Sequence, residues 1–107
     1  MREVTMREFA AARADGAFAL DVREPGEYLA GHIPGVVLMP MDQVAERLGE
    51  IPRSGPVYVV CATGNRSLSV AGFLARVGID ARSVAGGTSG WESAGLPVIR
   101  GAASNVA

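Results

Sequence analysis

The sequence is poor in the residues that bind metals and form disulfides. It holds one cysteine and one histidine among its 107 residues. One cysteine cannot form a disulfide within the chain, so a redox step would need a thiol from a second molecule. A single cysteine and a single histidine also fall short of a typical set of metal ligands. We therefore expect neither a bound metal nor an organic cofactor.

The sequence also lacks a surplus of charge and a long apolar run. Lysine and arginine total 10, aspartate and glutamate total 11, and the two signs are interspersed. Without a basic stripe, we expect no nucleic acid partner. No run approaches the ~18 apolar residues of a membrane span, and the charged segment 1–8 lacks the apolar core of a signal peptide. We therefore expect a cytoplasmic protein with no membrane partner.

What the sequence does contain indicates one α/β domain. The hydrophobic share is 49 %, and a chain of 107 residues can bury roughly two-thirds of its unfolded surface. Strand patterns alternate with helix patterns, which predicts a mostly parallel sheet with right-handed crossovers and helices on both faces. We expect strands at 18–22, 36–38, 57–60 and 81–85, helices at 6–14, 24–30, 42–48 and 67–77, and a short helix that begins at Thr88 or Ser89.

The central stretch runs from a strand through a tight loop into a helix. Its strand, Val57–Val60, consists of β-branched and aromatic residues, which is typical of a strand covered on both faces. The next residue, Cys61, then lies at the carboxyl edge of the sheet, where parallel folds bind ligands. Cys61 is therefore a candidate nucleophile. The alternative is a small buried apolar residue, which free cysteines often are.

The loop after Cys61 has the composition of an anion-binding loop. Small or flexible residues allow the backbone to turn its N–H groups inward, Arg66 adds a positive charge, and Ser67 is the predicted N-cap of the following helix. Lowering a thiol pKa of ~8.5 by ~2 requires about 2.7 kcal/mol, which a helix terminus and one or two charge-assisted hydrogen bonds can supply. The candidate loop residues are Ala62, Thr63, Gly64, Asn65, Arg66 and Ser67.

Three motifs carry a resemblance to a known family. They are Cys-x-x-Gly-x-Arg-Ser at 61–67, Asp-Val-Arg-Glu-Pro-x-Glu-Tyr-x-x-Gly-His-Ile-Pro-Gly at 21–35, and Gly-Gly-x-x-x-Trp-x-x-x-Gly-x-Pro-Val at 86–98. In this order, and over residues 18 to 98, the chain resembles the rhodanese-like single-domain sulfurtransferases. The resemblance implies about five strands. We place the rhodanese-like domain at 1–100 and expect a flexible tail at 101–107, because the tail has little to bury.

The resemblance implies a two-step sulfur transfer. The Cys61 thiolate would take the outer sulfur of a donor such as thiosulfate, and cyanide or a thiol would remove it from the resulting persulfide. Arg66 would orient an anionic donor, and a protein could serve as the sulfur acceptor. Two alternatives stay open. One is a sulfur-carrier or regulatory interaction module, and the other is a cysteine-dependent phosphatase or arsenate reductase. The spacing disfavours the second, because four residues separate Cys61 from Arg66 whereas cysteine phosphatases resemble Cys-x5-Arg.

Several residues outside the loop have both a structural and a functional interpretation. Asp21 and Arg23, at the end of a predicted strand, either form a structural pair or support the site beside Cys61. His32 lies in a Gly/Pro turn that the resemblance marks as structural, although a lone histidine near a cysteine also fits a general base. Trp91 either fills the core or forms a wall of the substrate pocket. The Gly86-Gly87 pair predicts a glycine-only backbone angle or a close approach to the Cys61 loop.

Overall fold

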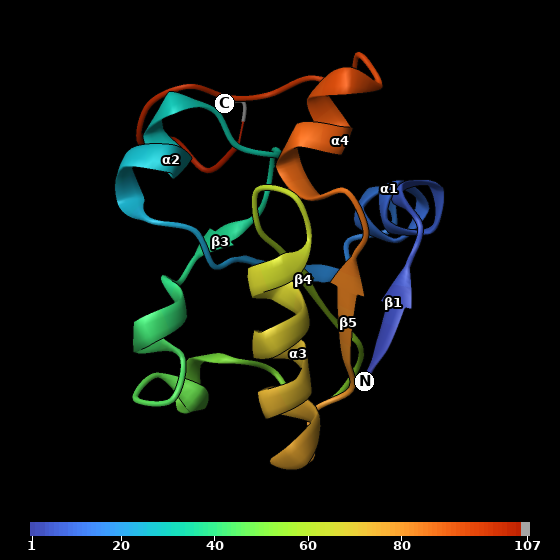
Figure 1. Cartoon of the computed structure of the whole chain (residues 1–107), viewed down its shortest axis with the longest axis vertical. Coiled ribbons are helices and arrows are strands. Elements are labelled where there is room, and N and C mark those ends of the chain that lie inside the picture. The colour runs from blue at the N-terminus through green and yellow to red at the C-terminus, as the bar shows by residue number, and fades with distance from the viewer. Residues whose placement is uncertain (106–107) are drawn as a thin grey trace.

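The fold is built on a five-stranded sheet in which every pair of neighbouring strands is parallel (Figure 1). The structure is a computed structural model and describes residues 1–105. The strand order is β1-β5-β4-β2-β3. The strands are β1 (Arg2–Val4), β2 (Phe18–Asp21), β3 (Val37–Leu38), β4 (Val57–Val60) and β5 (Ala81–Val84). The predicted parallel α/β sheet is thus confirmed, and so is its number of strands.

Helices cover both faces of the sheet, as expected. One face packs against α3 (Asn65–Arg76), which crosses the sheet in the foreground of Figure 1. The other face packs against α1 (Met6–Ala14), α2 (Pro25–Ala30) and α4 (Gly87–Ser93). Helix α1 begins with a capping box between Thr5 and Glu8. Within the described residues, no helix is both long and apolar enough to cross a membrane.

Strand β4 lies in the middle of the sheet and determines where the site forms. All four of its residues are buried, and Val59 is in register with Leu20 of β2 on one side and Ser83 of β5 on the other. The chain therefore leaves β4 at the same edge at which β2 and β5 end. The loop that follows β4 lies at the end of the sheet that also carries α2 and α4 (Figure 1).

The predicted helix over 42–48 is wrong. The structure has two short 3₁₀ segments there, Met41–Gln43 and Leu48–Glu50, with turns between them. Asp42 lies inside the first segment, and no side chain caps that segment. The Met41 N–H donates to Val22 O, and the Gln43 and Val44 N–H groups donate to the carbonyls three residues earlier, which is the hydrogen-bond pattern of 3₁₀ turns.

The C-terminal segment over 101–105 forms hydrogen bonds with the rest of the domain, and its flexibility stays a prediction. The Gly101 N–H donates to Leu29 O at 2.8 Å, and the Gly35 N–H donates to Ser104 O at 2.7 Å. The ring of His32 also contacts Ala103 O at 2.7 Å. These contacts attach the segment to α2 and the turn after it. Residues 106–107 of the expected tail lie outside the described residues, and the domain boundary at residue 100 stays a prediction.

Candidate active site

The site forms where β4 passes through a short loop into α3. The helix begins at Asn65, and Gly64 is its N-cap with φ 120°, a backbone angle that favours glycine. The prediction that Ser67 caps this helix is therefore wrong, because the helix starts two residues earlier than expected. Ser67 instead lies in the first turn of α3, where its buried side chain faces the sulfur of Cys61.

The Cys61 side chain is surrounded by hydrogen-bond donors. The residue is 1 % exposed, the Gly64 N–H donates to Sγ at 3.1 Å, and the Ser67 Oγ lies 3.4 Å from Sγ. Burial raises the pKa of the Cys61 thiol. Hydrogen bonds from the Ser67 hydroxyl and from the backbone N–H groups of Ser67, Gly64 and Thr63 outweigh burial, so the pKa lies below its ordinary value. These hydrogen bonds stabilise the thiolate, which is the nucleophilic form of cysteine, relative to its stability in an ordinary cysteine.

A second glycine turn holds the carbonyl side of the loop. Backbone N–H groups of Thr88 and Ser89 donate to Cys61 O at 2.8 Å and Ala62 O at 2.9 Å. Gly87 has φ 55°, and a Cβ at this position would lie 2.5 Å from Cys61 O. Both expectations for the glycine pair are thus confirmed: a backbone angle that favours glycine and a close approach to the loop. These bonds fix the first two carbonyls of the loop on α4, while the N–H groups of Thr63, Gly64 and Ser67 face the sulfur.

Arg66 forms an ion pair that the sequence analysis did not predict. Its Nη1 and Nη2 donate to Glu27 Oε1 at 2.8 Å and Oε2 at 2.9 Å, and both side chains are 36 % exposed. The hydrogen bonds from Arg66 lower the pKa of Glu27 to about 2, and those to Glu27 raise the pKa of Arg66. The positive charge of Arg66, which we expected to attract an anionic donor, is therefore already paired with the Glu27 carboxylate. The only signal in the sequence was the presence of Glu27 in the motif at 21–35.

Asp21 and Arg23 form a second, fully buried ion pair. Arg23 Nε lies 2.9 Å from Asp21 Oδ1, and its Nη2 lies 2.8 Å from both Asp21 Oδ2 and the Gly31 carbonyl oxygen. The Arg23 N–H also donates to Asp21 Oδ1. These bonds link the end of β2 to the end of α2. The pair thus holds in place the segment that carries Glu27. These contacts favour the structural interpretation of Asp21 and Arg23.

His32 and Trp91 both serve the core. The ring nitrogens of His32 lie 2.8 Å from Tyr28 O and 2.7 Å from Ala103 O, and the ring stacks on that of Tyr28. Trp91 is 2 % exposed and its indole N–H donates to Pro97 O at 2.7 Å. These contacts favour the structural interpretation of both residues over a general base and a pocket wall.

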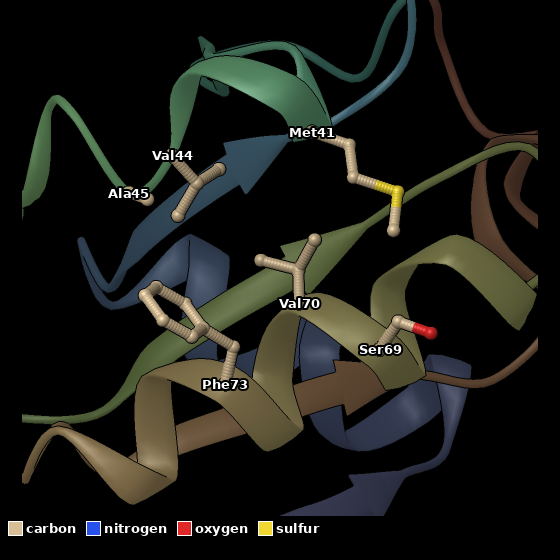
Figure 2. A pocket seen from close by; sticks show the side chains of 6 residues that line it. All are labelled: Met41, Val44, Ala45, Ser69, Val70 and Phe73. Atoms are coloured by element: carbon tan, nitrogen blue, oxygen red, sulfur yellow. The ribbon is translucent and has the colours of Figure 1, made fainter.

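An apolar groove lies between α3 and the segment that begins at Met41. It has a volume of about 190 Å³, and the side chains of Met41 and Val44 lie opposite those of Val70 and Phe73 on α3 (Figure 2). None of the loop residues 61–67 lines it. The groove is lined by Met41, Val44, Ala45, Ser69, Val70 and Phe73.

Comparison with known proteins identifies the family. The model of the rhodanese-like domain matches residues 5–94, so the chain belongs to the rhodanese-like domain family. It is 34 % identical over 93 residues to thiosulfate sulfurtransferase GlpE of Pseudomonas entomophila, covering 86 % of this chain and 85 % of that protein. It is 30 % identical over 89 residues to a sulfurtransferase of Allochromatium vinosum, covering 82 % and 83 %.

A solved structure has the same fold over nearly the whole chain. The rhodanese-related protein from Thermoplasma volcanium superimposes with a TM-score of 0.86 at 30 % sequence identity, covering 92 % of this chain and 98 % of that one. A shorter match is to the putative sulfur carrier protein YrkF of Bacillus subtilis. It is 41 % identical over 59 residues, which cover 55 % of this chain and 32 % of that protein.

Proposed function

We propose that the protein is a sulfurtransferase that moves a sulfane sulfur from a donor such as thiosulfate to cyanide or a thiol through a persulfide on Cys61. The observation that supports this most is the environment of the Cys61 sulfur, where a backbone N–H and a hydroxyl converge and the thiol pKa is lowered. The names of the relatives from Pseudomonas and Allochromatium support the same reaction class.

In the first proposed step, the Cys61 thiolate attacks the outer sulfur of thiosulfate. A bond forms between Cys61 Sγ and that sulfur, the sulfur–sulfur bond of thiosulfate breaks, and sulfite leaves with the electron pair. In the second step, the carbon of cyanide attacks the terminal sulfur of the persulfide. Thiocyanate leaves, and the Cys61 thiolate is restored. No general base is needed once the thiol is ionised, in agreement with the structural position of His32.

The loop from Ala62 to Ser67 would bind the sulfur that is transferred. Its backbone N–H groups stabilise a charged sulfur on Cys61 and, in the next step, a charged terminal sulfur of the persulfide. Arg66 would orient an anionic donor in competition with Glu27, whose carboxylate already occupies both terminal nitrogens of the guanidinium. A cytoplasmic location, inferred from the sequence alone, belongs to this proposal.

A sulfur carrier is the second candidate. The relative named as a putative sulfur carrier protein supports it, although the match covers about half of this chain. A carrier would turn over small donors slowly and exchange sulfur rapidly with one partner protein. A phosphatase or arsenate reductase stays disfavoured by the spacing, because four residues separate Cys61 from Arg66.

The test of the proposed function is an intact-mass measurement. Wild type and Cys61→Ser are treated with thiosulfate and then with cyanide. We expect wild type alone to gain one sulfur atom and to lose it to cyanide with release of thiocyanate. A gain of sulfur by the serine variant would contradict the assignment of Cys61. No gain on wild type from thiosulfate or from a panel of persulfide donors would contradict sulfur transfer.

A further inference from the structure

Ser83 is a buried hydroxyl that the proposed reaction does not use. It lies on β5 and is fully buried on the face of the sheet that α3 covers. Its Oγ lies 2.8 Å from Ser67 Oγ, which in turn lies 3.4 Å from Cys61 Sγ. The Ser67 hydroxyl of α3 and the Ser83 hydroxyl of β5 thus form a chain of contacts that ends at the sulfur.

The positions of the hydroxyl hydrogens follow from the acceptors around them. The Ser67 hydroxyl has one hydrogen, and one of its neighbours, Gly64 O at 3.0 Å, can only accept. Ser67 Oγ is the hydrogen-bond partner that the structure gives the Ser83 hydroxyl. Ser83 therefore donates to Ser67, because a buried hydroxyl hydrogen without an acceptor is costly. Ser67 keeps its own hydrogen for Gly64 O or for the sulfur of Cys61.

Ionisation of Cys61 changes which of these two groups needs that hydrogen. As a thiol, Cys61 can donate its S–H to Ser67 Oγ while Ser67 donates to Gly64 O. As a thiolate, the sulfur only accepts, and the Ser67 hydrogen can turn from Gly64 O to Sγ. Gly64 O is not left alone by this turn, since the Leu68 N–H also lies 3.4 Å from it. Ser83 donates to Ser67 in both states.

We propose that Ser83 is a positioning residue that anchors the Ser67 hydroxyl and leaves its single hydrogen available to the ionised sulfur of Cys61. The proposal rests on the proposed role of Cys61 as nucleophile. A hydroxyl that accepts one hydrogen bond is a stronger donor in the next, so the effect of Ser83 reaches the sulfur through Ser67. Without Ser83 the Ser67 hydroxyl loses both its anchor and this polarisation, and the thiolate is less stable.

The experiment is the rate of thiol alkylation by iodoacetamide as a function of pH. It uses wild type, Ser83→Ala, Ser67→Ala and the double variant, with Ser69→Ala on the outer side of α3 as a matched control. We expect Ser83→Ala to move the ionisation midpoint to higher pH and to lower the rate at neutral pH by about three- to ten-fold. Ser67→Ala shifts the midpoint further, and the double variant equals Ser67→Ala.

Two results would overturn the proposal. One is a Ser83→Ala midpoint equal to that of wild type, and the other is a shift from Ser83→Ala that persists in the Ser67→Ala background. If the alanine variant does not fold, as judged by circular dichroism, Ser83→Val removes the same hydroxyl with a residue that favours a strand. Alkylation needs no sulfur donor, so a protein inactive with thiosulfate would still report on Ser83. The alkylation result therefore tests the role of Ser83 even if the protein does not transfer sulfur.

Discussion

Two arginine–carboxylate pairs lie near the candidate site, and they differ in burial. The pair of Asp21 and Arg23 is buried, with side chains 1 % and 7 % exposed, and the pair of Glu27 and Arg66 lies at the rim with both at 36 %. The hydrogen-bond distances are similar, at 2.8 Å for the shortest contact in each. Distance alone therefore does not tell what an ion pair contributes to this molecule.

The difference in burial indicates different roles. We expect the buried pair to stabilise the fold and the rim pair to set the charge at the entrance to the site. A buried charge that loses its partner costs much stability, because water cannot replace the partner. A half-exposed pair contributes little to stability, because water screens it. Beside the sulfur that we propose to react, however, such a pair would set how much positive charge an anionic donor meets. The variants below separate these two roles, from the largest expected effect to the smallest.

The largest effect is expected from breaking the buried pair. Asp21→Asn removes the carboxylate and leaves the Arg23 guanidinium buried beside a neutral amide, which destabilises the fold by about 3–5 kcal/mol. Urea unfolding followed by circular dichroism measures the change. The double variant Asp21→Asn/Arg23→Met removes both charges and is expected to be more stable than Asp21→Asn alone. Equal stability of Asp21→Asn and wild type would contradict a bracing role.

Breaking the rim pair from the arginine side should affect activity far more than stability. Arg66→Ala removes the positive charge and leaves the Glu27 carboxylate to repel an anionic donor. We expect kcat/KM for thiosulfate to fall by about ten-fold or more, and stability to change by less than about 1 kcal/mol. Steady-state kinetics and urea unfolding give the two values. A loss of stability as large as that of Asp21→Asn would show that the two pairs have the same role.

Breaking the same pair from the carboxylate side should act in the opposite direction. In the wild type, the Glu24 N–H donates to Glu27 Oε1 at 3.0 Å, and Glu27→Gln keeps an oxygen for this hydrogen bond. The substitution removes the negative charge that pairs with Arg66. We expect the ratio of kcat/KM for thiosulfate to that for an uncharged persulfide donor to rise about three- to five-fold at low salt, and to rise less at high salt. Glu50→Gln, in the exposed pair with Arg47, is the matched control. An unchanged ratio would mean that Glu27 only anchors α2.

The comparison of the pairs also shows how far the sequence could predict this site. Strand and helix patterns predict β2 to β5 and the helices that cover the sheet, but they miss the edge strand β1 and place a helix over 42–48 where the structure has short 3₁₀ segments. A β-branched strand followed by Cys61 places the thiol at the edge of the sheet. The role of Ser67 could not be derived, because it depends on helix α3 starting at Asn65 and not two residues later. The partner of Arg66 is 39 residues away in sequence, and only the folded chain brings α2 beside the loop. Local patterns carry no information on such a pairing.

The smallest effect concerns pH and tests whether the rim pair adds to stability at all. The pKa of Glu27 is lowered from its ordinary value to about 2 by the hydrogen bonds from Arg66. A carboxyl group with a lowered pKa stabilises the fold above its unfolded pKa of about 4.5, and this contribution is lost as the pH falls toward 2. Because the pair is more than a third exposed, we expect the difference in unfolding free energy between wild type and Glu27→Gln to stay below about 1 kcal/mol. That difference should be constant from pH 8 to pH 5 and should shrink below pH 4.5, as urea unfolding at each pH can show. If the difference in unfolding free energy grew on acidification, its sign would be wrong for a stabilising Glu27–Arg66 ion pair, and the prediction would be contradicted.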